Sequence, residues 1–184
     1  MTDGADRAGD LVIRLAESDE DLAFMLPLSR EFHAASHYGD MPYDLAARNA
    51  AARMAIDRPD RHGYIMAAHR DVPAGFLACM AGTYMTGGSA ILVTVQTLYV
   101  GESFRRSLLS GRIATRMLAG AVRWAEARNA REIMIHVTTG IDVARTDRFL
   151  RKAGFATLGG NYALPLSPRE GARVVDDDDD WSGE

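Results

Sequence analysis

Hydrophobic and polar residues follow one another in periods that predict helices in the first third of this chain. A short apolar run predicts a strand over 11–15, and Ser18 then resembles a helix N-cap. Apolar residues at three-to-four spacing predict a helix from there to about Ala35, with a kink or break at Pro27. An alanine-rich segment with the same spacing predicts a second helix over 43–57.

Strand-like runs dominate the middle of the chain. The segments 63–69 and 73–81 should form a hairpin that turns at 70–73. A third run over 91–100 is rich in β-branched residues and predicts another strand. An amphipathic pattern over 109–128 then predicts a long helix with one apolar stripe.

The C-terminal part alternates between strand and helix. A buried strand is predicted over 132–137, a short helix over 142–153 with Gly154 as its C-terminal cap, and a last strand region over 157–166. The resulting order is β-α-α-β-β-β-α-β-α-β, an antiparallel meander followed by alternating helices and strands. This order predicts an α/β fold with a mixed central sheet flanked by helices, in which 109–128 forms a right-handed crossover.

Length and composition indicate one folded domain. The chain has 184 residues, of which 47% are hydrophobic and 25% charged, as in soluble globular proteins. We expect a disordered N-terminus over 1–10, a folded domain over 11–166 and a disordered acidic tail over 167–184. The tail contains consecutive aspartates over 176–180, which repel one another.

The same sequence disfavours several classes of partner. No apolar run approaches the roughly 20 residues that span a membrane, and the first residues lack the pattern of a signal peptide. Cys79 is the only cysteine, which excludes an intrachain disulfide and fits a reducing cytoplasm. The net charge of −4 without a basic block argues against nucleic acid. His33 and His37 have no third ligand nearby, so no metal is expected.

One strand–turn–helix segment carries the strongest functional signal. The strand that ends at Val100 passes through Gly101 and a short polar stretch into the long helix. The first turn of a helix has unpaired N–H groups at the positive end of its dipole, and these bind anions. Arg105, Arg106 and Arg112 add positive charge there. A ligand with phosphates would suit this segment, and an ordinary turn with solvated arginines is the alternative.

This segment resembles the GNAT family of acyl-CoA-dependent N-acetyltransferases. That family has a strand ending in Leu-Tyr-Val, followed by Pro-x-x-Arg-Gly-x-Gly-x-Gly/Ala and a helix. Residues 98–100 and Arg105 match this pattern at the expected spacing, and Gly111 supplies a later small residue. Arg106 and Ser107 stand where the family usually has Gly-x.

Further segments extend the resemblance over most of the predicted domain. Gly-Phe-Leu at 75–77 is similar to the family's third strand, and 149–155 is similar to its Leu-Tyr-x-x-x-Gly-Phe helix ending, with Leu150 at the tyrosine position. Segments 37–44 and 138–142 resemble a bacterial and phage-associated branch. The predicted order of helices and strands is also that of the GNAT fold.

The resemblance implies direct transfer of an acetyl group from acetyl-CoA to an amine within a ternary complex, without a metal. The acceptor would be a small-molecule amine or a protein amine. The residues expected to bind coenzyme A are Leu98, Tyr99, Val100, Arg105, Arg106, Ser107, Leu108, Leu109, Ser110 and Gly111. The residues expected to bind the acceptor are His33, His37, Tyr38 and Gln96.

Leu150 leaves the family's usual acid position without a proton donor. The candidate replacements are Tyr84, Tyr38 and Tyr162. His136 is a further candidate, although its place in a predicted buried strand favours a hydrogen-bonded core histidine. The missing tyrosine keeps a second reading open, in which the chain is a non-catalytic acyl-CoA-binding or phage-particle interaction module. A homodimer is compatible with either reading, and no motif of another nucleotide-binding fold follows an early strand.

Overall fold

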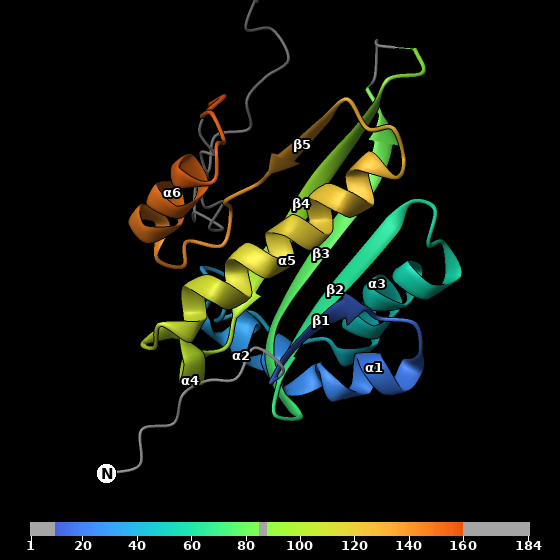
Figure 1. The fold of residues 1–184 in the computed structure, drawn as a ribbon. Coiled ribbons are helices and arrows are strands. Elements are labelled where there is room, and N and C mark those ends of the chain that lie inside the picture. The colour runs from blue at the N-terminus through green and yellow to red at the C-terminus, as the bar shows by residue number, and fades with distance from the viewer. Residues whose placement is uncertain (1–9, 85–87, 160–184) are drawn as a thin grey trace, which may run out of the picture.

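The computed structural model describes residues 10–84 and 88–159, which form a five-stranded sheet flanked by helices (Figure 1). The strand order is β1-β2-β3-β4-β5, with antiparallel pairing from β1 to β4 and parallel pairing of β5 with β4. This arrangement confirms the predicted α/β fold with a mixed sheet. The elements are β1 (Leu11–Leu15), α1 (Asp19–Phe24), α2 (Leu26–Ala35), α3 (Leu45–Asp57), β2 (His62–His69), β3 (Val72–Thr83), β4 (Ile91–Val100), α4 (Glu102–Arg105), α5 (Leu109–Glu126), β5 (Glu132–Ile135) and α6 (Val143–Lys152).

The expected last strand and both expected tails fall largely outside the described part. Residues 157–159 form no strand, and the rest of the segment 157–166 lies outside the described residues. Tyr162, residues 1–9 and the acidic tail over 167–184 lie outside them as well. The domain boundaries expected at both ends therefore stay predictions.

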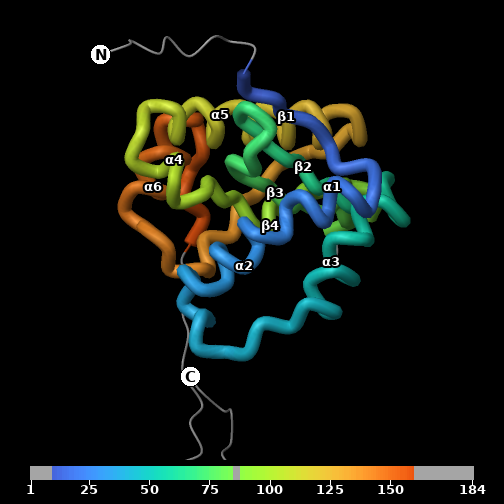
Figure 2. Tube along the Cα trace, turned by 90° about the horizontal axis from the view of Figure 1, so that it is seen from below, coloured from blue at the N-terminus to red at the C-terminus, as the bar shows by residue number. Residues whose placement is uncertain are grey.

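The helix α5 covers one face of the sheet, and α2 and α3 cover the other (Figure 2). On α5, Ile113, Met117 and Ala121 recur at four-residue spacing and are fully buried. They share a hydrophobic cluster with Leu77 of β3. Because successive side chains of a strand point to opposite faces, the neighbouring Phe76 belongs to the cluster under α2 and α3. The sheet is thus buried on both faces.

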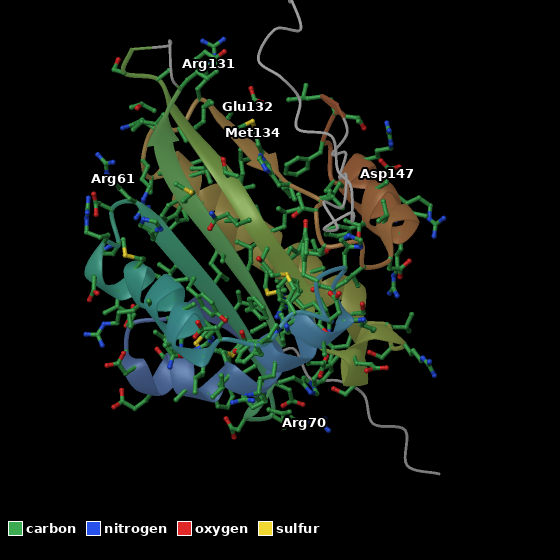
Figure 3. The ribbon with its side chains drawn as sticks, turned by 180° about the vertical axis from the view of Figure 1, so that it is seen from behind. Arg61, Arg70, Arg131, Glu132, Met134 and Asp147 are labelled. Atoms are coloured by element: carbon green, nitrogen blue, oxygen red, sulfur yellow. The ribbon has the colours of Figure 1, made fainter. Side chains whose placement is uncertain are left out.

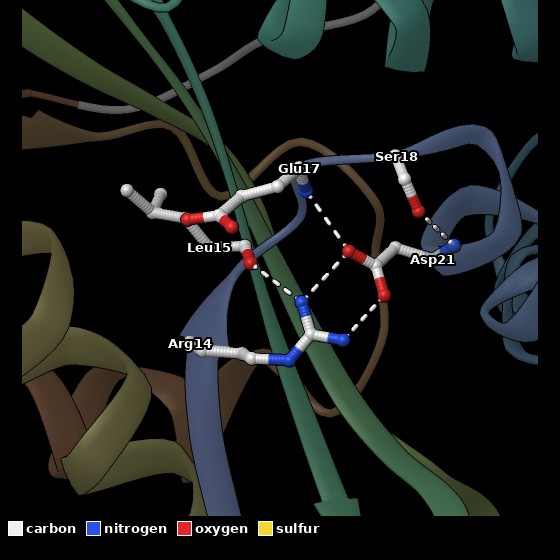
Figure 4. A network of polar contacts seen from close by, with 5 residues as sticks. All are labelled: Arg14, Leu15, Glu17, Ser18 and Asp21. Atoms are coloured by element: carbon white, nitrogen blue, oxygen red, sulfur yellow. Dashed lines mark hydrogen bonds and ion pairs between the residues drawn. The ribbon is translucent and has the colours of Figure 1, made fainter.

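A polar network joins β1 to the start of α1 (Figure 4). Ser18 Oγ accepts a hydrogen bond of 3.3 Å from the N–H of Asp21, which confirms Ser18 as the N-cap. The Asp21 carboxylate accepts two hydrogen bonds from Arg14, one of them 2.7 Å long, and another of 2.9 Å from the N–H of Glu17. These bonds fix the direction in which the chain leaves β1.

Two predicted changes of chain direction are confirmed. Helix α1 ends at Phe24, and Pro27 lies in the first turn of α2, where its missing N–H costs no hydrogen bond. The β2–β3 hairpin turns at Arg70 and Asp71, whose φ angles of 50° and 59° are those of a tight turn that matches the twist of the strands. Figure 3 shows Arg70 at this turn, at the opposite end of the sheet from Arg131.

The strand β5 is shorter and less buried than the sequence predicts. It spans Glu132–Ile135 instead of 132–137, forms the edge of the sheet and has Glu132 exposed. An edge strand has a partner on one side only, so an apolar sequence there does not ensure burial. His136 lies beyond the strand with an exposed side chain, so the expectation of a core histidine is wrong. Glu132 and Met134 mark the course of β5 in Figure 3.

The helix α6 ends with the predicted glycine cap. Gly154 has a φ of 94°, in the left-handed region that glycine adopts without strain. Its N–H donates to the carbonyl of Arg151 at 3.0 Å, and the N–H of Phe155 donates to the carbonyl of Leu150 at 3.0 Å. These two bonds form a Schellman motif and satisfy the carbonyls of the last helical turn.

Candidate functional site

A cavity opens where β4 and β5 part. Their parallel ladder ends at Val95 and Ile135, and the N–H of His136 donates a further bond of 3.1 Å to the carbonyl of Val95. The strand β4 continues to Val100 while the chain leaves β5 toward α6 (Figure 1), and a cavity of about 160 Å³ lies between these segments. Its polar lining residues are Gln96, Thr97, Tyr99, Arg105, Ser110, His136, Thr139, Asp142, Arg145 and Thr146.

A β-bulge at Gln96 changes the course of β4 beside the cavity. Ala78 of β3 pairs with Thr97, and the next residue, Cys79, pairs with Val95, so Gln96 has no partner on β3. Bulges bend a strand and redirect its side chains, and they are frequent next to active sites. Gln96 is exposed and lines the cavity, and its Nε2 donates to the sulfur of Met80 at 3.3 Å.

The guanidinium of Arg105 enters the cavity from α4. Its Cζ lies 4.5 Å from the centroid of the Tyr99 ring, and its Nε donates to the carbonyl of Val100 at 2.9 Å. The Nη2 atom of Arg105 is buried and has no hydrogen-bond partner in the described part of the chain. A buried donor without an acceptor is costly, so this atom is suited to an anionic ligand.

The start of α5 lies beside Arg105 and offers further donors. No side chain caps this helix, whose N-cap residue is Leu108, and a Cβ added at Gly111 would meet no other atom within 4 Å. Arg145 of α6 donates to the carbonyl of Arg105 at 3.1 Å and to Ser110 Oγ at 3.2 Å. Two arginines, a hydroxyl and the end of a long helix therefore meet at one side of the cavity, which fits a ligand that carries phosphates.

The position of Tyr99 is fixed by Glu31 of α2, on the face of the sheet that α2 and α3 cover. Its hydroxyl donates to Glu31 Oε1 at 2.8 Å, and the same oxygen accepts a hydrogen bond of 2.6 Å from the N–H of Glu102. Burial and the hydrogen bond to Glu31 raise the pKa of the Tyr99 hydroxyl well above that of a free tyrosine. Tyr99 therefore stays neutral at neutral pH, and its proton is engaged by Glu31.

Comparison with known families decides the family of this chain. The model of the acetyltransferase (GNAT) family matches residues 24–155, which include all the cavity-lining residues named above. This chain belongs to the GNAT acetyltransferase family. Among proteins with curated descriptions, none matches the sequence.

Solved structures share the GNAT fold with this chain at low sequence identity. A probable acetyltransferase is 20% identical, with a TM-score of 0.63 over 86% of this chain and 99% of that chain. AAC(6')-Iy in complex with the bisubstrate analogue CoA-S-monomethyl-acetylneamine is 19% identical, with a TM-score of 0.60 over 86% of this chain and 98% of that chain. An aminoglycoside acetyltransferase from an uncultured soil metagenomic sample, in complex with trehalose, is 14% identical, with a TM-score of 0.66 over 87% and 99%.

The residues expected to bind coenzyme A divide into two groups in this GNAT chain. Those that line the cavity are Leu98, Tyr99, Val100, Arg105, Ser110 and Gly111. Those that do not line it are Arg106, Ser107, Leu108 and Leu109. Leu108 is fully exposed and Leu109 packs against the core under α5, because the helical turn of α4 changes the direction of the loop. The binding role of each residue stays a prediction.

The residues expected to bind the acceptor lie at the cavity and beside it. Gln96 lines the cavity. The N–H of His37 donates to the carbonyl of Thr139 at 2.7 Å, which holds the loop after α2 against the cavity wall. The His37 ring lies 5.1 Å from that of Tyr38, which is exposed, while His33 forms a 2.8 Å hydrogen bond with the Met41 carbonyl. Their roles in acceptor binding stay predictions.

The candidate proton donors lie in different places. Tyr84 is exposed just beyond the end of β3, next to the β3–β4 connection, and does not line the cavity. Tyr38 lies on the loop after α2, and Tyr162 lies outside the described residues. Leu150, at the family's tyrosine position, is buried and lines the cavity. His136 also lines the cavity and is exposed.

One residue of this site, Arg145, was missed by sequence reasoning. It stands 40 positions from Arg105 on a helix with several basic residues, and nothing in the local pattern distinguishes it from its neighbours. The expectation that no metal binds stays a prediction, although residues 10–84 and 88–159 contain no group of three or more metal-ligating side chains. Within the same ranges, no helix combines the length and the apolar character needed to cross a membrane.

Proposed function

We propose that this protein is an N-acyltransferase that transfers the acetyl group of acetyl-CoA to an amine by direct attack in a ternary complex. The observation that carries the proposal is the buried Nη2 of Arg105, which has no hydrogen-bond partner in the described part of the chain. Arg105 lines the cavity, as do Ser110 and Gly111 at the start of α5. The phosphates of coenzyme A would supply the acceptor that this atom lacks, at the positive end of the α5 dipole.

The remaining lining residues would hold the rest of the donor. Beyond Val95, β4 has no partner strand on the side of β5, so an extended ligand could lie along this edge and bond the backbone groups of the segment 98–100 that are not already paired with β3 or, at the Val100 carbonyl, with Arg105. Arg145 would add a second positive charge while it holds α6 against the start of α5. Acetyl-CoA supplies the activated acyl group, and the protein orients it and shields it from water.

The acceptor would be an amine of a small molecule or of a protein. The loop over 36–44 borders the cavity through the bond from His37 to Thr139, and it carries the aromatic and polar side chains His37 and Tyr38. Two of the similar solved structures are aminoglycoside acetyltransferases, which makes an aminoglycoside a reasonable acceptor to test. Membership of the bacterial and phage-associated branch, a homodimer and a cytoplasmic location remain parts of the proposal.

The experiment combines binding with turnover. Calorimetry with acetyl-CoA tests the donor site, and release of free thiol is then followed with sisomicin, spermidine, an amino acid amide and a peptide with a free N-terminus. We expect saturable binding and thiol release that depends on one of these amines. Absence of acetyl-CoA binding would overturn the proposal. Binding without turnover would instead favour a non-catalytic acyl-CoA-binding module, the second candidate, which Leu150 in the tyrosine position supports.

A further inference from the structure

The proposed transfer requires a group that moves a proton. The attacking amine must lose a proton and the departing thiolate gains one, and a positioned side chain speeds such steps by roughly 10²–10⁴-fold. Leu150 lines the cavity and cannot take part. The titratable residues that line the cavity in the described part are Tyr99 on β4, Arg105 on α4, Asp142 and Arg145 at the start of α6, and His136.

Four of these five groups are poorly suited to the task. The Tyr99 hydroxyl is buried, and its proton is engaged by Glu31 at 2.8 Å. Guanidinium groups keep their protons in proteins, which disqualifies Arg105 and Arg145. The Asp142 carboxylate is engaged in an ion pair with Arg145, whose Nη1 lies 3.9 Å from Asp142 Oδ2.

His136 is held where β4 and β5 part. Its N–H donates to the carbonyl of Val95 at 3.1 Å, so its backbone is anchored by the last bond between these segments. The next residue of β4 is the bulged Gln96, which also lines the cavity. His136 is exposed rather than packed in the core, and it is one of the residues that line the cavity. His136 thus has an anchored backbone and lies beside the bulge of β4, where a ligand that extends along β4 would pass.

The geometry points to His136 as the catalytic residue that carries the proton from the attacking amine to the departing thiolate. The assignment rests on the proposed function. The amine nitrogen forms a bond to the acetyl carbonyl carbon, and the bond from that carbon to sulfur breaks with its electron pair on sulfur. The neutral imidazole takes the proton that the amine nitrogen loses, and the resulting imidazolium delivers it to the thiolate. The products are an amide and the free thiol of coenzyme A, and the imidazole is again neutral.

An imidazole suits both halves of this transfer. Among unperturbed side chains it is the one that changes charge between pH 5 and 8, so it accepts and donates protons with similar ease near neutral pH. The charged groups that share the cavity with it are Arg105 from α4 and Asp142 and Arg145 from α6, with the neutral Tyr99 on β4. A change of activity with pH that is lost when the imidazole is replaced is therefore assigned to His136.

The first test compares His136→Gln with the matched control His62→Gln, since His62 starts β2 and does not line the cavity. Acceptors are the amines of the panel above. We expect His136→Gln to lower kcat by at least about 100-fold and to remove one inflection from the pH profile of kcat/KM. The Kd for acetyl-CoA should stay within about threefold in both variants, and His62→Gln should keep the kcat of the parent protein. Added imidazole should restore part of the turnover of His136→Ala.

A second test uses the unmodified protein and no turnover. Addition of free CoA should shift the NMR signals of the His136 ring and leave those of His62 in place. Unshifted His136 signals at saturating CoA would overturn the assignment. A kcat of His136→Gln within about threefold of the parent value would also overturn it. The same holds if kcat falls a hundredfold in Tyr38→Phe or Tyr162→Phe while His136→Gln keeps the parent kcat. If the parent protein binds no acetyl-CoA or acetylates no amine, the proposed function and this assignment fail together.

Discussion

Glu31 and Tyr99 are joined by a hydrogen bond of 2.8 Å that connects α2 to β4. The same carboxylate oxygen accepts the N–H of Glu102 at the start of α4. One side chain therefore fixes both the end of β4 and the start of α4, the short helix that carries Arg105. The ring of Tyr99 in turn supports the Arg105 guanidinium at 4.5 Å.

Replacement of Glu31 should destabilise the fold through Tyr99. In Glu31→Ala the Tyr99 hydroxyl remains buried without its acceptor, which costs about 1–3 kcal/mol of unfolding free energy. Urea unfolding of Glu31→Ala, Tyr99→Phe and the double variant gives a coupling energy, expected at about 0.5–3 kcal/mol. Glu126→Ala, on the exposed side of α5, should change stability by less than about 0.5 kcal/mol. Additive single effects would show that the two residues act independently.

Reversal of charge at Arg105 should weaken acetyl-CoA binding. We expect the Kd of Arg105→Glu to rise at least tenfold, or about 1.4 kcal/mol, because a carboxylate would face the phosphates from inside the cavity. Arg123→Glu makes the same change of charge on α5 outside the cavity lining and controls for net charge. Calorimetry with acetyl-CoA measures both, and an equal loss in the two variants would contradict the placement of the phosphates.

A methyl group at Gly75 should not be tolerated. An added Cβ would lie 2.7 Å from the carbonyl oxygen of Tyr99 and 2.9 Å from Cε of Met117, and the Tyr99 backbone is held within the sheet. Gly75→Ala should therefore cost about 1–3 kcal/mol. Gly82→Ala is the matched control in the same strand, because its added Cβ would meet no atom within 4 Å. Equal thermal unfolding of the two variants would contradict this packing.

Stability should fall at alkaline pH. Burial raises the pKa of the Cys79 thiol to about 12 and that of the Tyr64 hydroxyl to about 12. In the unfolded chain these groups ionise at about 8.5 and about 10, so the folded state keeps protons that the unfolded state loses. The stabilisation is complete below those values and is lost as pH rises toward 12, by about 1.4 kcal/mol per pH unit for each group. Urea unfolding between pH 7 and 11 measures it, and Cys79→Ala should remove the part of the decline that begins below pH 10.

The sequence predicted the elements whose signals are local. Pro27 separates α1 from α2 because a proline disrupts a helix wherever it stands beyond the first turn. The strand β4 has the bounds that its run of β-branched residues predicts, and the stripe of Ile113 and Met117 correctly places α5 on the sheet. These elements are fixed by patterns that recur within a few residues, so neighbours distant in sequence did not alter them.

The sequence could not predict features that depend on distant neighbours. His136 appeared to belong to a buried strand, but β5 is an edge strand and ends before it. Arg105 and Arg106 are neighbours of the same residue type, yet only Arg105, the last residue of α4, lines the cavity. Arg145 reaches this loop from α6, and that contact has no trace in the local sequence.

The short pairing between β4 and β5 has a consequence for local stability. The strand β5 has four residues and a partner on one side, whereas β4 has ten and pairs with β3 at every residue except the bulged Gln96. Amide protons of the parallel ladder should thus exchange with solvent at lower opening free energies than those of the meander. We therefore expect the side of the cavity that carries β5 and α6 to open without unfolding of the side that carries β4, which would let a long ligand enter without a break in the main sheet.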